Sequence, residues 1–442
     1  MINSSKVWLS TLCWFVCFPT LIFSESLTKF EFVGLILFLF YLLLASLKLT
    51  KNSFIILSIL AVIGIILIGD WPSWQELDSS SEFVLIFACL FPTLTVMRSM
   101  AMAMPPILET QKRLATLDGN NASSGIQLTS HLIGGVINIG TFSIIAAALP
   151  ENADIKKRRD AASAAMRGMN SAILWSPFFI SFAVASIYLP SGFATGAISL
   201  GAFIAAVFFA FSHFIIHSKA GTISLLQSIQ SLKPIIFWLI LIGTSVIVMS
   251  VITGFNALKA VCITMPLLFI VAIVARPKIT GHVIKNFVQL QKNSGDEILI
   301  ISVSMIIATQ ISEAGQLQMT MLYFYGTEPA LNSILLSLPI LVWLAAIIGI
   351  HPIISAAPLL AYFSTNLTVF DAAFVAQAHM IGWSAGTMTS FSSLSTILVS
   401  QQFRLKNTML SFGINFPVAG LLAAGGGLFL ILIHELISLM TL

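Results

Sequence analysis

The chain has 442 residues, of which 57% are hydrophobic and only 9% are charged, and its formal net charge is +4. A soluble domain has about a quarter of charged residues, so this composition excludes a protein built mainly from soluble domains. The basic residues lie in short stretches between apolar runs, and they offer no basic face to a nucleic acid. Apolar runs near the ~20 residues that cross a bilayer recur along the chain, which predicts an all-α polytopic membrane protein.

Eleven apolar runs predict transmembrane helices. They are 7–23, 31–47, 52–69, 82–100, 162–190, 194–216, 234–253, 257–275, 297–312, 372–400 and 408–436. The first run lacks a small-residue cleavage site, so we expect it to be a retained span. Two further apolar regions, 122–149 and 331–361, are too long for one span and contain polar or helix-breaking residues.

The loop charges predict the topology. If the N-terminus is cytoplasmic and both irregular regions return to the side from which they enter, every basic residue except Lys29 and Lys259 lies inside. A single crossing by either region would weaken this bias. The sequence therefore predicts two re-entrant hairpins, about 11 crossings and a periplasmic C-terminus in a bacterial inner (plasma) membrane.

An internal repeat appears at a constant offset of 214 residues. Residues 166–186, "MRGMNSAILWSPFFISFAVAS", align with residues 380–400, "MIGWSAGTMTSFSSLSTILVS", and the same offset superposes 135–147 on 349–361. The identical pairs include Met166/Met380, Gly168/Gly382, Ser176/Ser390, Ser181/Ser395, Ser186/Ser400, Gly135/Gly349 and Ala147/Ala361. An odd number of crossings separates the halves, which predicts the inverted-topology repeat found in many secondary transporters.

The expected domain order follows from this repeat. An N-terminal helix occupies 1–30, a first inverted repeat 31–216, a cytoplasmic connector 217–233 and a second inverted repeat 234–442. In the first repeat we expect scaffold helices at 31–100, a hairpin at 122–149 and a broken helix at 162–190. In the second repeat the corresponding parts are 234–312, 331–361 and 372–400.

Irregular backbone at membrane depth is tolerated where it lines a cavity or is buried in protein. Each half offers a hairpin tip and a broken span, where free helix ends and hydroxyl or amide side chains suit a small anion. The candidate solute-binding residues are Asn138, Thr141, Asn170, Ser171, His351, Ser355, Ser384, Gly386 and Thr387. A sodium ion is considered near Asn138, Asn170, Pro352 and Ser384.

Structural interpretations stand beside these functional ones. Ser and Thr in membrane helices often pack or bond back to their own helix. For His351 we favour the role of a structural tip residue over that of a proton carrier. We interpret His131 as structural and Arg167 as a cap on the inner end of a broken span. No carboxylate lies clearly at the midplane, which disfavours cation/proton exchange and favours an anionic solute.

The arrangement resembles the ion transporter superfamily, and within it the divalent anion/sodium symporter group. The resemblance covers nearly the whole chain as architecture, while the tips "VINIGT" and "IHPIIS" match the family's Ser-Asn-Thr tip motif only at Asn138 with Thr141. Asn170-Ser171-Ala172 and Ser384-Ala385-Gly386-Thr387 occupy the family's broken-helix positions. The resemblance implies an elevator mechanism and a homodimer formed through the scaffold spans.

The sequence thus predicts a secondary active transporter of a small, carboxylate-like solute, coupled to Na⁺ or H⁺. Its expected partners are this solute and membrane lipids. A membrane-embedded enzyme or flippase for a lipid-linked substrate is the alternative, and a channel is the third candidate. No catalytic Ser/His/Asp set, metal motif or phosphate-binding glycine loop stands out, so we expect no enzyme activity and no cofactor besides a coupling ion.

Overall fold

The computed structural model describes residues 2–22, 28–68, 74–116, 119–216, 222–255, 257–313 and 316–441. The regular elements in these ranges are all helices. Six of the described helices are long and apolar enough to cross a membrane, and a pair bent by 50°, Pro277–Asn293 with Gly295–Ile311, could form a seventh. The six are Leu85–Ala103, Ala122–Ala146, Phe193–Ile216, Ile229–Thr253, Leu258–Ala275 and Asn415–Met440. The chain is therefore an all-helical, multi-pass membrane protein.

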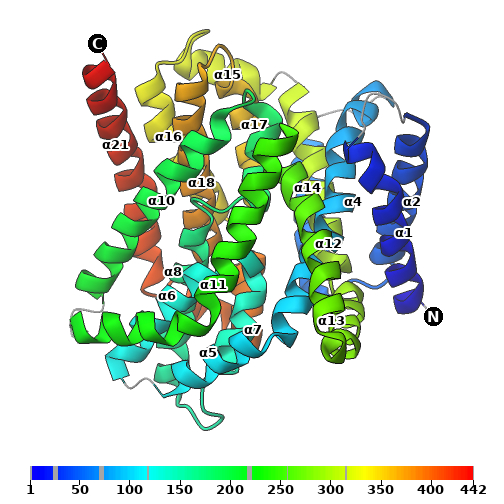
Figure 1. Cartoon of the computed structure of the whole chain (residues 1–442). Helices are drawn as coiled ribbons and strands as arrows, with labels where there is room; N and C mark the ends of the chain where they lie inside the picture. Colours follow the sequence, from blue (N-terminus) through cyan, green and yellow to red (C-terminus); the bar gives the residue numbers. More distant parts are fainter. Residues whose placement is uncertain are drawn as a thin grey trace. The chain divides into compact units, whose positions relative to one another are not determined.

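The chain divides into two compact units, each built from two separate stretches of sequence. Unit 1 comprises Met1–Met104 and Ser245–Phe324, and unit 2 comprises Pro105–Thr244 and Tyr325–Leu442. Figure 1 shows the helices in sequence colours. Each predicted repeat contributes to both units, because its first helices belong to unit 1 and its irregular regions belong to unit 2.

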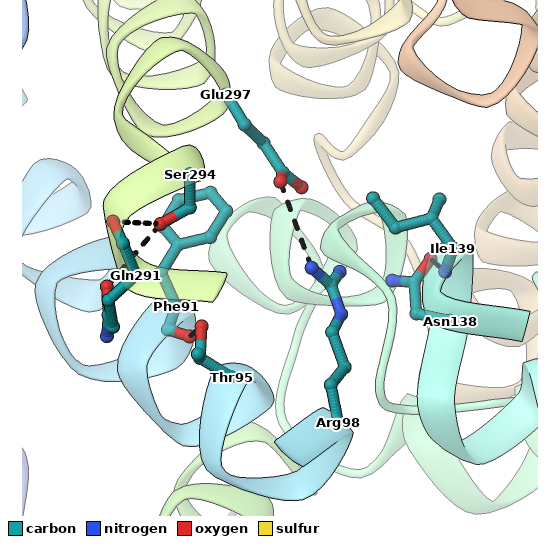
Figure 2. Close-up of polar contacts among 8 residues, drawn as sticks. All are labelled: Phe91, Thr95, Arg98, Asn138, Ile139, Gln291, Ser294 and Glu297. Atoms are coloured by element: carbon teal, nitrogen blue, oxygen red, sulfur yellow. Dashed lines mark hydrogen bonds and ion pairs between the residues drawn. The ribbon is translucent and has the colours of Figure 1, made fainter. Parts of the chain in front are cut away.

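Unit 1 is organised around one long helix, α4, which packs against α1, α2, α12, α13 and α14. Arg98 of α4 forms an ion pair with Glu297 of α14 at 3.8 Å, and both side chains are largely buried (Figure 2). The helices are α1 (Ile2–Ile22), α2 (Thr28–Ser46), α3 (Lys51–Ile68), α4 (Trp74–Ala103), α12 (Ala257–Ala275), η3 (Pro277–Ile279), α13 (Thr280–Asn293), α14 (Gly295–Glu313) and most of α15 (Gln316–Tyr325). The basic stretch 276–292, which connects two predicted spans, is largely helical, and Val283 and Gln291 are the buried residues of α13.

Unit 2 contains two series of helices in a similar order. The first series is α5 (Pro105–Ala115), α6 (Gly119–Ile137), η1 (Asn138–Gly140), α7 (Thr141–Ala146), α8 (Ile155–Ala172), α9 (Ile180–Tyr188), α10 (Phe193–Phe211) and η2 (Ser212–Ile216). The second is α16 (Leu331–Ile347), α17 (Pro352–Phe363), α18 (Val369–Thr389), α19 (Leu394–Phe403), α20 (Asn407–Ser411) and α21 (Asn415–Thr441). Helix α11 (Thr222–Thr253) runs from unit 2 into unit 1.

Helix starts in the two series keep the spacing seen in the sequence. Helices α8 and α18 begin at Ile155 and Val369, and the residue before each, Asp154 or Thr368, caps the helix by accepting a backbone N–H bond. Helices α9 and α19 also begin one offset apart. Within unit 2, α6 and α7 lie toward the lower end of the view and α16 and α17 toward the upper end (Figure 1).

Two predicted boundaries need correction. The span after the cytoplasmic connector 217–233 was expected to begin at 234, whereas α11 already begins at Thr222, and residues 217–221 lie outside the described residues. The last predicted span began at 408, whereas α21 begins at Asn415 after the short helix α20. The buried Asn415 side chain bonds to Arg167 and to the Ser163 carbonyl, which fixes the start of α21.

Candidate functional site

The first irregular region turns back on itself at Asn138. This residue has a φ of +60°, a left-handed conformation that asparagine tolerates, and its Oδ1 accepts a bond from the Ile139 N–H at 2.7 Å (Figure 2). Gln111 of α5, which precedes α6, donates from Nε2 to the carbonyl of Ile144 on α7 at 3.1 Å. Although 122–146 has the length of one span, α7 therefore returns toward the start of α6.

The second irregular region turns at residues 348–351. Gly349 has a φ of +94°, and His351 caps α17 because its Nδ1 accepts a bond from the Ile353 N–H at 3.3 Å. The returning helix ends beside residues that precede α16: the Tyr362 hydroxyl donates to the Gly326 carbonyl. Pro352 directly follows this turn and occupies the first helical position of α17, where its fixed φ suits the start of a helix.

Both broken spans break later than the sequence predicts. Helix α8 continues through Asn170 and Ser171 to Ala172, and α18 continues through Ser384, Gly386 and Thr387 to Thr389. The amide of Asn170 and the hydroxyl of Ser171 donate to carbonyls of their own helix, so these polar side chains do not end it. The breaks at 173–179 and 390–393 instead contain Pro177 and the helix cap Ser393.

The ends of these two helices meet in the interior of unit 2. Ser384 Oγ donates to the Asn170 carbonyl at 2.7 Å, and the two residues are 214 positions apart, which is the offset of the repeat. Thr387 Oγ1 donates to Asn170 Oδ1, also at 2.7 Å. Asn170 and Ser384 have no exposed surface, and Thr387 is 8% exposed. Equivalent positions of the two halves thus form a buried polar cluster, which we call the Asn170 cluster (Asn170, Ser384 and Thr387).

Equivalent helices of the two series in unit 2 pack in equivalent pairs. Helix α17 packs on α9, and the equivalent pair α7 and α19 also pack together. Helix α18 packs on α9, and α8 packs on α19 in the same way. A Cβ on Gly386 would lie 2.8 Å from Ala346 Cβ and 3.5 Å from Pro352 Cγ, so this glycine lets α18 approach the second tip.

The other predicted site residues are not linked to the cluster by a described hydrogen bond. Asn138 Oδ1 is occupied by the neighbouring N–H, and Ser355 Oγ donates to the Pro352 carbonyl at 3.2 Å in the first turn of α17. Thr141 is fully buried at the start of α7, and its hydroxyl has no hydrogen-bond partner among the described residues. Of the positions considered for sodium, Asn170 and Ser384 are joined by a hydrogen bond.

Several buried polar residues were missed or misread from the sequence. Arg167, interpreted from the sequence as a helix cap, bonds to side chains of other helices: its Nη1 donates to Asn415 Oδ1 at 2.7 Å and its Nε to Gln127 Oε1 at 3.3 Å, so it joins α8 to α21 and α6. Gln377 Nε2 donates to the carbonyls of Leu174 and Ala197, which fastens α18 to the first break and to α10. His379 Nε2 bonds to the Ser181 carbonyl at 3.0 Å.

The signal for Gln377 and His379 was the pair of polar residues in the otherwise apolar run "VAQAHM" (375–380). Polar side chains inside a membrane helix need partners in the protein interior.

The Asn170 cluster consists of hydroxyl and amide groups, which can bind a small polar solute or an alkali cation reversibly. In the described ranges no group of three or more His, Cys, Asp or Glu residues could hold a metal ion.

Comparison with known proteins adds no family: no family model matches the sequence, and no curated protein matches it.

Proposed function

We propose that the chain is a secondary active transporter of a small anionic, carboxylate-like solute, driven by Na⁺ or H⁺. The observation that carries this proposal is the Asn170 cluster, where equivalent residues of two sequence repeats bond to one another inside an apolar helical unit. Binding sites of secondary transporters lie where two inverted repeats meet, at helices that are interrupted near the midplane. The cluster fits this description, since it joins equivalent residues of the two predicted repeats, and Asn170 and Thr387 each lie within one turn of the end of their helix.

The division into units supports an elevator mechanism. Unit 2 holds both helical hairpins and both broken helices, whereas unit 1 holds the stretch 31–100 and most of 234–312. In this proposal unit 2 carries the solute and unit 1 is the scaffold, which forms the homodimer. The resemblance to the divalent anion/sodium symporter group supports the same assignment. The proposed location is the bacterial inner membrane, with the N-terminus cytoplasmic and the C-terminus periplasmic.

The inverted repeat predicts opposite exposure of two loops of unit 2. Lys157 at the start of α8 and Thr365 after α17 are both exposed, and the four native cysteines are buried. We expect a Lys157→Cys chain to react with an impermeant maleimide only from the cytoplasmic side and a Thr365→Cys chain only from the periplasmic side. Thr365 is preferable to Asn366, whose φ of +60° would strain a cysteine. Labelling of both cysteines from the same side would refute the inverted repeat.

The coupling ion is testable in reconstituted vesicles. A screen of small mono- and dicarboxylates for thermal stabilisation of the purified chain first selects a solute, because a ligand that binds the native state raises its stability. We then expect uptake of this solute to accelerate when an inward Na⁺ or H⁺ gradient is imposed, and to return to baseline when an ionophore dissipates that gradient. Uptake that responds to neither gradient would contradict secondary active transport.

A further inference from the structure

His131 of α6 joins this helix to the end of α8 through both of its ring nitrogens. Its Nδ1 lies 2.9 Å from Ser171 Oγ, and its Nε2 lies 3.1 Å from Trp175 Nε1, at the first break. An indole N–H can only donate, so Nε2 must accept and cannot carry a proton. The ring is therefore neutral, with its hydrogen on Nδ1, which donates to Ser171 Oγ. The Ser171 hydroxyl in turn donates a hydrogen bond to the Gly168 carbonyl at 2.8 Å.

The surrounding packing holds Trp175 in this position. A Cβ on Gly135, one turn after His131, would lie 2.7 Å from Trp175 Cζ2, so the absence of a side chain there admits the indole ring. The hydroxyl of Ser176 donates to the Gly135 carbonyl and fastens the next residue of the break to the same turn of α6. These contacts of His131 and Gly135 with Ser171, Trp175 and Ser176 form what we call the α6 clasp.

Few charged groups face the clasp from the elements packed on α6. Helix α8 presents Arg167, which bonds to Gln127 one turn before His131, and η2 presents His213, which bonds to Ser124 at 2.8 Å. Elements η1 and α7 contain no titratable residue. Helix α5 carries Glu109, Lys112 and Arg113, which lie on its exposed or half-exposed side, and the remaining charged residues of α8 lie in its first two turns, at 156–160.

We propose that His131 is the proton-coupling residue of the transport cycle, and that proton uptake on its Nε2 opens the α6 clasp. The step is a simple protonation: a proton from water binds the Nε2 lone pair, and the hydrogen bond from Trp175 is lost. Two N–H donors would then face each other across 3.1 Å, so the indole must move away. His131 is the one member of the clasp whose side chain can take up a proton in this way.

Opening the clasp acts on the solute site through one peptide bond. Ser171, which bonds to His131, directly follows Asn170, whose carbonyl and side chain hold Ser384 and Thr387. Movement of Trp175 also frees the segment 173–179 between α8 and α9. The inference rests on the proposed transport function, because a coupling residue has a role only in a transport cycle. It commits the coupling ion to a proton, which the cluster alone leaves open.

The test measures access to the end of α8 without any solute. Ala172 is fully buried beside the first break, so an Ala172→Cys chain reports opening of the clasp by its rate of reaction with a methanethiosulfonate. Rates are divided by those of the exposed Lys157→Cys chain, which removes the pH dependence of the thiol itself. Between about pH 8 and about pH 5 we expect the normalised rate to rise, by up to about tenfold per unit of pH.

Two substitutions separate the proposal from a purely structural role of His131. With His131→Gln the amide oxygen can still accept from Trp175, and we expect a slow rate that no longer depends on pH. With Trp175→Phe the donor is absent, and we expect a fast rate at both ends of the pH range. His213→Gln is the matched control, because His213 also bonds to α6, and it should keep the pH response of the parent.

A pH response that persists in the His131→Gln chain would overturn the proposal, and so would a Trp175→Phe chain that reacts as slowly as the parent. The transport proposal fails by a different observation, namely uptake that responds to no ion gradient. A chain that transports with Na⁺ alone and shows no pH-dependent labelling would keep the transport function and refute His131 as the coupling residue.

Discussion

An Asn170→Leu chain is expected to fold and to lose solute uptake by more than about tenfold, which corresponds to ~1.4 kcal/mol or more of lost binding. Asn170 contributes both its carbonyl and its Oδ1 to the link between the two halves, and leucine removes the Oδ1. The fold should survive, because the Thr387 hydroxyl also lies within hydrogen-bond distance of the carbonyls of Trp383 and Ser384. Leucine also removes the bond that the Asn170 amide donates to the Met166 carbonyl. The expected stability cost is therefore about 2 kcal/mol, at about 1 kcal/mol for each of the two lost hydrogen bonds.

A second substitution and a control test the same prediction from the other helix. Thr387→Val removes only the hydroxyl at the centre of the cluster and should reduce uptake similarly. Thr110→Val in α5 removes a buried hydroxyl that bonds back to its own helix at 3.0 Å, and it should transport normally. Uptake is compared in vesicles with equal amounts of folded protein, as judged by gel filtration. Normal transport by both Asn170→Leu and Thr387→Val would move the solute site away from the cluster.

The order of helices in unit 2 was largely predictable from the sequence, because the residues of the two halves align at one constant offset of 214 residues. Helix α9 begins at Ile180 and α19 at Leu394, and the N-caps Asp154 and Thr368 keep the same spacing. Composition alone predicted an all-helical membrane protein, and this is confirmed. Asn170 and Ser384, which align at this offset, are also hydrogen-bonded to each other in the structure.

The positions of the breaks were predicted less well, for a local physical reason. Runs such as Asn170-Ser171 and Ser384 to Thr387 were expected to interrupt their helices, because polar side chains at membrane depth suggest irregular backbone. In a helix, however, Ser, Thr and Asn can satisfy their donors with carbonyls three or four residues earlier, as Asn170 does with Met166. Proline and N-capping serine, here Pro177 and Ser393, are the better markers of a break.

The partners of buried polar residues could not be predicted, because they depend on tertiary contacts. Gln377 bonds to carbonyls about 200 positions away, and Arg167 bonds to Asn415 in another helix. Hydrophobic periodicity describes which face of a helix is apolar and carries no information on which helix it meets. The same limit applied to His131, whose two partners lie on α8 and at its break.

Replacing Gly168 by alanine is expected to destabilise unit 2 by about 1–3 kcal/mol, the usual cost of overpacking a well-packed interior. A Cβ at Gly168 would collide with the Gln127 carbonyl and lie 2.8 Å from Ser130 Cβ, so α8 would have to move away from α6. Backbone atoms of a packed helix cannot yield as a flexible side-chain end can. The displacement would also pull Ser171 away from His131 and weaken the α6 clasp.

Gly382, the repeat equivalent of Gly168, should behave in the same way, because a Cβ there would lie 2.9 Å from Pro339 Cα and 2.9 Å from Val342 Cβ. Gly243 in α11 is the matched control: a Cβ there meets nothing within 4 Å, so Gly243→Ala should be neutral or stabilise by up to about 1 kcal/mol. The thermal unfolding midpoint of each purified chain in detergent measures the effect. If Gly168→Ala and Gly382→Ala unfold at the same temperature as the parent, close approach of α6 to α8 and of α16 to α18 does not explain why both halves carry glycine here.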